Sequence, residues 1–129
     1  MRQQLLMSGL VGLGGFLGSI LRYSLGIMGQ CFSVAWPLGT FCANVLGCFA
    51  IGLIMALSLK GDVLSPELKL ALATGFCGGF TTLSSLMYET SEMLRAHEYT
   101  HAGLYVGSTL ACSLAAFYLG TIVMRLIFR

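Results

Sequence analysis

The stretch GFCGGFTTLSSL, residues 75–86, places helix-breaking and hydrogen-bonding residues in the middle of an apolar segment. Three glycines lead into four hydroxyl side chains, and no charged residue occurs from Leu70 to Tyr88. Non-helical backbone at membrane depth survives only where protein, water or an ion satisfies its polar groups. Freed carbonyls suit a cation, whereas freed N–H groups and hydroxyls suit an anion. The stretch therefore predicts an ion site at a broken membrane helix or, alternatively, a glycine kink patched by its own hydroxyls.

The composition of the chain is that of a membrane protein. Apolar residues make up 57% of its 129 residues and charged residues 9%, about a third of the charged share of a soluble domain. The net charge of +2 is too small to indicate a nucleic-acid partner. The five cysteines form no C-x-x-C pair and stand at no metal-ligand spacing from a histidine. These patterns argue against a disulfide oxidoreductase and against a metal cluster held by side chains.

Four apolar stretches are long enough to cross a bilayer, which takes about 20 residues of helix. They cover residues 4–28, 34–59, 68–94 and 102–125, joined by short links. Ser65 and Pro66 have the residue types expected for the N-cap and first position of the third helix. We expect one domain, residues 1–129: an all-α integral membrane fold of four transmembrane helices with a break in the third.

Three glycine pairs have the small-x-x-x-small spacing that lets membrane helices approach closely. They are Gly14 and Gly18, Gly75 and Gly79, and Gly103 and Gly107. Packing inside a four-helix bundle explains most of them. Four helices enclose little interior, however, so we also expect the chain to dimerise.

Polar side chains recur four residues apart on the second helix. Thr40, Asn44 and Cys48 share one face, and Asn44 is the only side-chain amide in that segment. Its amide either bonds a neighbouring helix or points into a pathway as a donor. Arg22 follows a long apolar run, and a charge at this depth needs a partner or a purpose. It either extends to the membrane surface or lines a wet vestibule that attracts anions.

The fourth helix carries a second polar stripe at the same spacing. Tyr105, Thr109 and Ser113 lie on one helical face. Three hydroxyl groups facing lipid would be costly, so this face should meet protein or water. The chain thus combines two polar stripes with the predicted broken helix, which an assembly protein with four membrane helices and no transport role would not need.

These motifs resemble those of the CrcB/Fluc fluoride channels, and the resemblance covers nearly the whole chain. GGFLGSILRY, residues 14–23, is similar to the first-helix motif that ends in Arg-Tyr, and PLGTFCANVLGCFAIG, residues 37–52, to the second-helix motif with its central Asn. GFCGGFTTLSSLMYE, residues 75–89, resembles the broken third helix, usually Gly-Gly-x-Thr-Thr-Phe-Ser-Thr-Phe.

The resemblance implies a fluoride-selective channel, not an enzyme, that exports toxic fluoride by passive diffusion across the cell (inner) membrane. It implies an antiparallel, dual-topology homodimer with a structural sodium ion at its centre, bound by the backbone carbonyls of Gly78 and Thr81. Arg22 would occupy a vestibule, and Glu89 matches the acidic residue after the break. The remaining polar pore groups implied are Asn44, Ser84, Ser85, Tyr105, Thr109 and Ser113.

The chain departs from the family pattern where two pore phenylalanines are usual. Leu83 and Leu86 occupy those positions. The edge of a phenylalanine ring is partly positive and can contact an anion, whereas leucine offers only apolar bulk. We expect both leucines to act as apolar constriction residues, with an altered conduction rate.

The distribution of basic residues leaves two assemblies open. One end of the bundle would hold Arg2, Lys60, Lys69, Arg125 and Arg129, and the other Arg95, with Arg22 if it reaches that interface. An excess of Lys and Arg marks cytoplasmic loops. The chain therefore either inserts both ways as a homodimer or pairs with an oppositely oriented paralogue. A small multidrug-type proton-coupled exporter is the remaining alternative, but the first helix has no carboxylate for proton coupling.

Overall fold

The computed structural model describes residues 1–32, 36–59 and 63–128, and its regular structure over those residues is entirely helical. Three of the long elements are unbroken: α1 (Arg2–Phe32), α2 (Leu38–Ser58) and α6 (Tyr99–Ile127). With the third span, Pro66–Arg95, they make four helices long and apolar enough to cross a membrane. The prediction of four membrane helices is confirmed, and the chain is a multi-pass membrane protein.

The observed bounds of all four helices differ by a few residues from the predicted ones. The first helix extends beyond residues 4–28 at both ends. Arg2 and Gln3 at its start are good helix formers, and Gly29 at its end packs against the backbone of Gly39. The second begins at Leu38, directly after Pro37, whereas its predicted start at Val34 lies outside the described residues.

The third span consists of several segments. It begins with α3 (Pro66–Lys69), where the Ser65 side chain accepts a hydrogen bond of 3.2 Å from the Leu68 N–H, as predicted for an N-cap. It continues as the π-helix η1 (Leu70–Cys77) and the short α4 (Gly78–Phe80). Thr81 and Thr82 then have extended backbone, with ψ of 155° and 121°, before α5 (Leu83–Arg95) begins.

The extended residues lie at the hydroxyl side chains of the opening stretch and not at its glycines. Gly78 and Gly79 are both helical. Thr82 is the N-cap of α5, and its side chain accepts from the Ser85 N–H. The Thr82 hydroxyl therefore starts the new helix, whereas Gly79 allows close packing against Gly15 and Gly78 faces open space.

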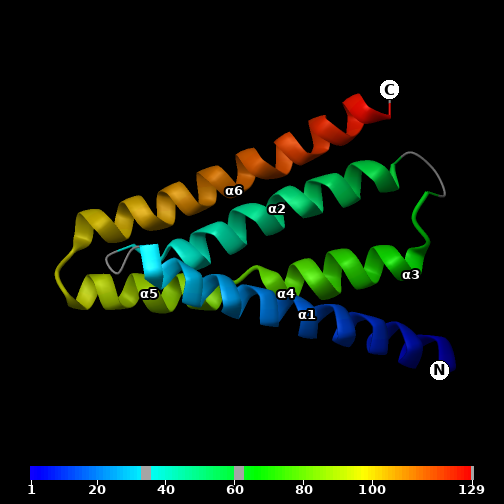
Figure 1. The fold of residues 1–129 in the computed structure, drawn as a ribbon, viewed down its shortest axis with the longest axis horizontal. Coiled ribbons are helices and arrows are strands. Elements are labelled where there is room, and N and C mark those ends of the chain that lie inside the picture. Colours follow the sequence, from blue (N-terminus) through cyan, green and yellow to red (C-terminus); the bar gives the residue numbers. More distant parts are fainter. Residues whose placement is uncertain (33–35, 60–62, 129) are drawn as a thin grey trace.

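The elements lie side by side as long rods (Figure 1). α2 packs mainly along α6, and α1 packs along η1 and α4. Both chain ends lie at the same end of the bundle, and the α5–α6 turn lies at the other (Figure 1). This arrangement brings the polar faces of α2 and α6 to the extended residues between α4 and α5.

Two of the three glycine pairs fit α1 against the third span. A Cβ at Gly14 would overlap the carbonyl oxygen of Ala71, and one at Gly18 would overlap that of Phe76. A Cβ at Gly79 would meet the backbone of Gly15 in the same way. By contrast, nothing lies within 4 Å of a Cβ at Gly103 or Gly107 in the described chain. That pair is open on the outer surface of α6.

Candidate functional site

Asn44 holds the extended segment through both ends of its amide. The Thr82 N–H donates to Asn44 Oδ1 at 2.7 Å, and Asn44 Nδ2 donates to the Thr82 carbonyl at 3.0 Å. One of the two amide hydrogens is thereby used on protein, which leaves the other for a further acceptor. Of the two readings of Asn44, the bond to a neighbouring segment is observed, and donation to an ion stays a prediction.

The same bonds leave two carbonyl groups without their helical donors. In an α-helix the Gly78 carbonyl would accept from the Thr82 N–H, and the Thr81 carbonyl from the Ser85 N–H. The Thr82 N–H instead donates to Asn44, and the Ser85 N–H to Thr82 Oγ1 at 3.1 Å. Gly78 is also exposed, with nothing within 4 Å of a Cβ built there. The two carbonyls predicted as sodium ligands have therefore each lost the usual partner.

A pocket of about 220 Å³ lies against the extended segment, and we call it the break pocket. Its lining comes from α2, the extended residues, α5 and α6. The lining residues are Asn44, Cys48, Thr81, Thr82, Leu83, Leu86, Thr109, Leu110 and Ser113. The pocket thus brings together five of the predicted pore residues, from three parts of the chain.

The two α6 hydroxyls in the break pocket differ in their hydrogen bonding. Thr109 Oγ1 donates to the Tyr105 carbonyl of its own helix at 2.7 Å. Ser113 Oγ is buried and has no hydrogen-bond partner among the described residues. A buried hydroxyl without a partner carries a desolvation cost. Ser113 is therefore the hydroxyl in this pocket that is best placed to receive a further partner.

Two predicted pore serines do not line the break pocket. The Oγ atoms of Ser84 and Ser85 each lie 3.1 Å from Thr82 Oγ1. They form a small hydroxyl cluster at the start of α5, next to the pocket wall. Their part in a pore stays a prediction.

The two leucines at the predicted constriction have different surroundings. The Leu83 side chain is 66% exposed in the single chain, whereas Leu86 is 2% exposed. Leu86 packs in the apolar core with Met93, Ala102 and Tyr105. Both line the break pocket, but only Leu83 has open space around it.

Glu89 is the centre of a second polar cluster, one that sequence reasoning did not assemble. Thr40 Oγ1 donates to Glu89 Oε1 at 2.7 Å, and the Tyr105 hydroxyl donates to Glu89 Oε2 at 2.6 Å. Tyr105 is fully buried, and its ring meets that of Trp36 edge to face with centroids 5.6 Å apart. Tyr105 therefore binds Glu89 and does not line the break pocket.

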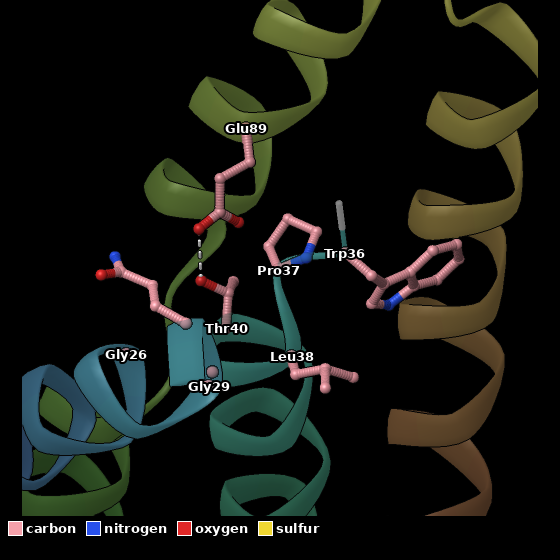
Figure 2. A pocket seen from close by; sticks show the side chains of 9 residues that line it. Gly26, Gly29, Trp36, Pro37, Leu38, Thr40 and Glu89 are labelled. Atoms are coloured by element: carbon pink, nitrogen blue, oxygen red, sulfur yellow. Dashed lines mark hydrogen bonds between the residues drawn. The ribbon is translucent and has the colours of Figure 1, made fainter. Parts of the chain in front are cut away.

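This carboxylate borders a separate pocket of about 190 Å³ between the end of α1 and the start of α2. Figure 2 shows Glu89 pointing toward Thr40 from α5, with Gly26 and Gly29 of α1 beside them and Pro37 and Trp36 opposite. The helical spacing of Thr40 and Asn44 was the available signal for this cluster. The partner carboxylate, 49 residues further along the chain, could not be identified from spacing alone.

Arg22 lines neither of these pockets. Its Nε donates to the Gly79 carbonyl at 3.1 Å, and the Ser19 hydroxyl approaches the same oxygen at 3.5 Å. The proposal that Arg22 extends to the membrane surface does not account for this bond to the middle of the third span. Its role in a vestibule stays a prediction.

Comparison with known proteins identifies relatives over most of the chain. The family model described as "CrcB-like protein, Camphor Resistance (CrcB)" matches residues 9–121. The fluoride-specific ion channel FluC of Chlorobaculum tepidum is 47% identical over 117 residues, which cover 91% of this chain and 93% of that protein. The FluC of Gloeothece citriformis is 43% identical and covers 90% of this chain and 94% of its own length.

These matches cover the third span with its extended residues, the helix that carries Asn44 and the polar stripe of α6. The two relatives are 47% and 43% identical to this chain and cover 91% and 90% of it. The chain belongs to the CrcB-like protein family.

Proposed function

We propose that this chain forms a fluoride-selective ion channel that lets fluoride leave the cell by passive diffusion. The observation that carries the proposal is the break pocket, in which Asn44, Thr109 and Ser113 converge on an extended segment at membrane depth. The relatives named as fluoride-specific ion channels support the choice of ion.

The chemistry of the break pocket suits a small, strongly hydrated anion. Such an ion must exchange its water for hydrogen-bond donors. Asn44 retains one amide hydrogen beyond its bond to Thr82, and Ser113 Oγ has no partner in the described chain. Among the described residues, no lysine or arginine lines the pocket. Weak binding by neutral donors allows an ion to leave as readily as it enters.

We propose that the channel is an antiparallel homodimer. The break pocket is open on one side, where Leu83 and Leu110 are 66% and 58% exposed. A second copy would cover these side chains and close the pathway. The open Gly103 and Gly107 pair on α6 supports close approach of another helix.

The extended segment fits a structural sodium ion. The carbonyl oxygens of Gly78 and Thr81 have lost their helical donors, and backbone oxygens are suitable ligands for a hard cation. A sodium ion bound there would supply fixed positive charge and tie the third spans of two copies together. The chain's own contribution is to hold the carbonyls free, through Asn44 and Thr82.

Fluoride efflux from liposomes containing the purified chain tests the proposed function. With a potassium ionophore to balance charge, we expect rapid loss of trapped fluoride and retention of trapped chloride in matched vesicles. Equal leakage of the two anions, or fluoride retention equal to that of protein-free vesicles, would contradict the proposal.

A further inference from the structure

We infer that Arg22 is a positioning residue that caps the Gly79 carbonyl through its Nε–H group, and that transport depends on this donor and not on the arginine charge. The inference rests on the proposed channel function, and it concerns a residue whose predicted role was to attract anions. Arg22 therefore acts through the backbone of the third span.

The Gly79 carbonyl has lost its helical partner. Its usual donor would be the Leu83 N–H, but Leu83 begins α5 beyond the extended residues Thr81 and Thr82. Arg22 Nε replaces that donor at 3.1 Å, with Ser19 Oγ at 3.5 Å. An unpaired carbonyl at this depth would carry a large desolvation cost. The cap removes that cost at the end of α4.

The packing of α1 brings Arg22 to this carbonyl. Gly18 lies one turn before Arg22 on the same helical face, and a Cβ at Gly18 would overlap the Phe76 carbonyl. Gly79 in turn lies against the backbone of Gly15. The two backbones are thus in direct contact one turn away, which leaves the Arg22 side chain a short reach to the Gly79 oxygen.

The cap bears on the proposed ion site through the neighbouring peptide groups. Gly79 directly follows Gly78 and stands two residues before Thr81, whose carbonyls are the proposed sodium ligands. Fixing the Gly79 peptide restricts the rotation of the peptides on either side of it. Loss of the cap should therefore disorder the carbonyls of the extended segment and the wall of the break pocket.

The identity of the donating atom distinguishes the cap from an electrostatic role. Nε stands four bonds from the Arg22 Cα, and glutamine carries its amide nitrogen at the same position without a charge. Lysine keeps the charge but has a methylene there, and methionine has a similar length with neither donor nor charge. A capping role therefore favours Arg22→Gln, whereas anion attraction favours Arg22→Lys.

The test compares the full-length wild type with Arg22→Gln, Arg22→Met and Arg22→Lys. Each is assayed for fluoride efflux from liposomes and for thermal unfolding in detergent. We expect Arg22→Gln to keep efflux within about threefold of wild type and Arg22→Met to lose about tenfold or more. The glutamine keeps a donor at the position of Nε, whereas the methionine leaves the carbonyl only the longer 3.5 Å contact from Ser19 Oγ. The melting temperatures should rank in the same order, and Arg22→Lys should not exceed Arg22→Gln in either assay.

Equal behaviour of Arg22→Gln and Arg22→Met, in both efflux and unfolding, would overturn the inference. Retention by Arg22→Lys alone would overturn it in favour of the charge. Wild-type efflux separately decides the proposed function. If the wild type did not transport fluoride, the unfolding temperatures of the glutamine and methionine variants would still decide whether the cap exists.

Discussion

At the residue scale, Asn44 binds the backbone of Thr82 through both ends of its amide. The helical pattern predicted only part of this arrangement. The spacing of Thr40, Asn44 and Cys48 identified a face directed into the protein, and both Thr40 and Asn44 are 8% exposed. Helical phase gives the face of a residue but not its partner. The bond to Thr82, 38 residues away, depends on how α2 lies against the third span. The sequence therefore predicted an inward-facing amide at Asn44, and the structure identifies Thr82 as its partner.

Replacing Asn44 should affect both transport and stability. Asn44→Ala removes both bonds to Thr82 and leaves a backbone N–H and a carbonyl with fewer partners, at a cost of about 1–3 kcal/mol. We expect a lower melting temperature and strongly reduced fluoride efflux. Ser58→Ala on the same helix is the control, since among the described residues the Ser58 hydroxyl bonds only the carbonyl of Ile54 in its own helix. Wild-type efflux by Asn44→Ala would remove this residue from the pathway.

The two leucines of the predicted constriction should respond differently to phenylalanine. Leu83→Phe places the larger ring in open space, so we expect normal stability and a changed, faster fluoride efflux if the ring edge contacts the anion. Leu86→Phe adds volume to a filled core and should cost about 1–3 kcal/mol. Thermal unfolding and efflux of both variants check this. Equal destabilisation by the two changes would contradict the burial difference.

At the scale of elements, the sequence predicted the third membrane helix better than the position at which its backbone becomes extended. The extended residues lie within the cluster of glycines and hydroxyls at residues 75–86. Yet Gly75, Gly78 and Gly79 are helical, and the extended residues are Thr81 and Thr82. A glycine lowers helix stability but also permits close approach, and spacing alone does not separate these roles. The π-helix of residues 70–77 had no signal in the sequence, because it differs from an α-helix only in hydrogen-bond register.

The contact between α1 and the third span should be sensitive to a single methyl group. Gly18→Ala would force Cβ against the Phe76 carbonyl, and we expect a loss of about 1–3 kcal/mol in stability. Gly12→Ala is the matched control on the same helix, since nothing lies within 4 Å of its Cβ. Thermal unfolding of both variants checks this. A similar melting temperature for the two would show that α1 can move away from the third span.

At the scale of the whole molecule, apolar length predicts the four membrane spans. It does not predict the direction in which the chain inserts or the chain with which it assembles. The described basic residues Arg2, Lys69 and Arg125 lie toward the end that holds both termini, and Arg95 lies at the other end (Figure 1). Lys60 and Arg129, which also entered the predicted charge bias, lie outside the described residues. The charge bias favours one insertion direction, whereas the family resemblance favours both.

Labelling of single cysteines should decide the insertion pattern. In a cysteine-free chain expressed alone, Val63→Cys and Ala96→Cys place an exposed thiol at opposite ends of the bundle. For a dual-topology homodimer we expect each thiol to be labelled by an impermeant reagent from both sides of the membrane. Labelling of Val63→Cys from the cytoplasm only, with Ala96→Cys from outside only, would instead require an oppositely oriented paralogue.

Current recording in a planar bilayer tests the central claim most directly. On the proposed function, fluoride crosses passively along a pathway walled by Asn44, Thr109 and Ser113. With fluoride at different concentrations on the two sides and chloride equal, we predict a current that reverses at the fluoride equilibrium potential. A current that reverses at the chloride potential, or membranes that stay silent while the same preparation is folded, would contradict the account.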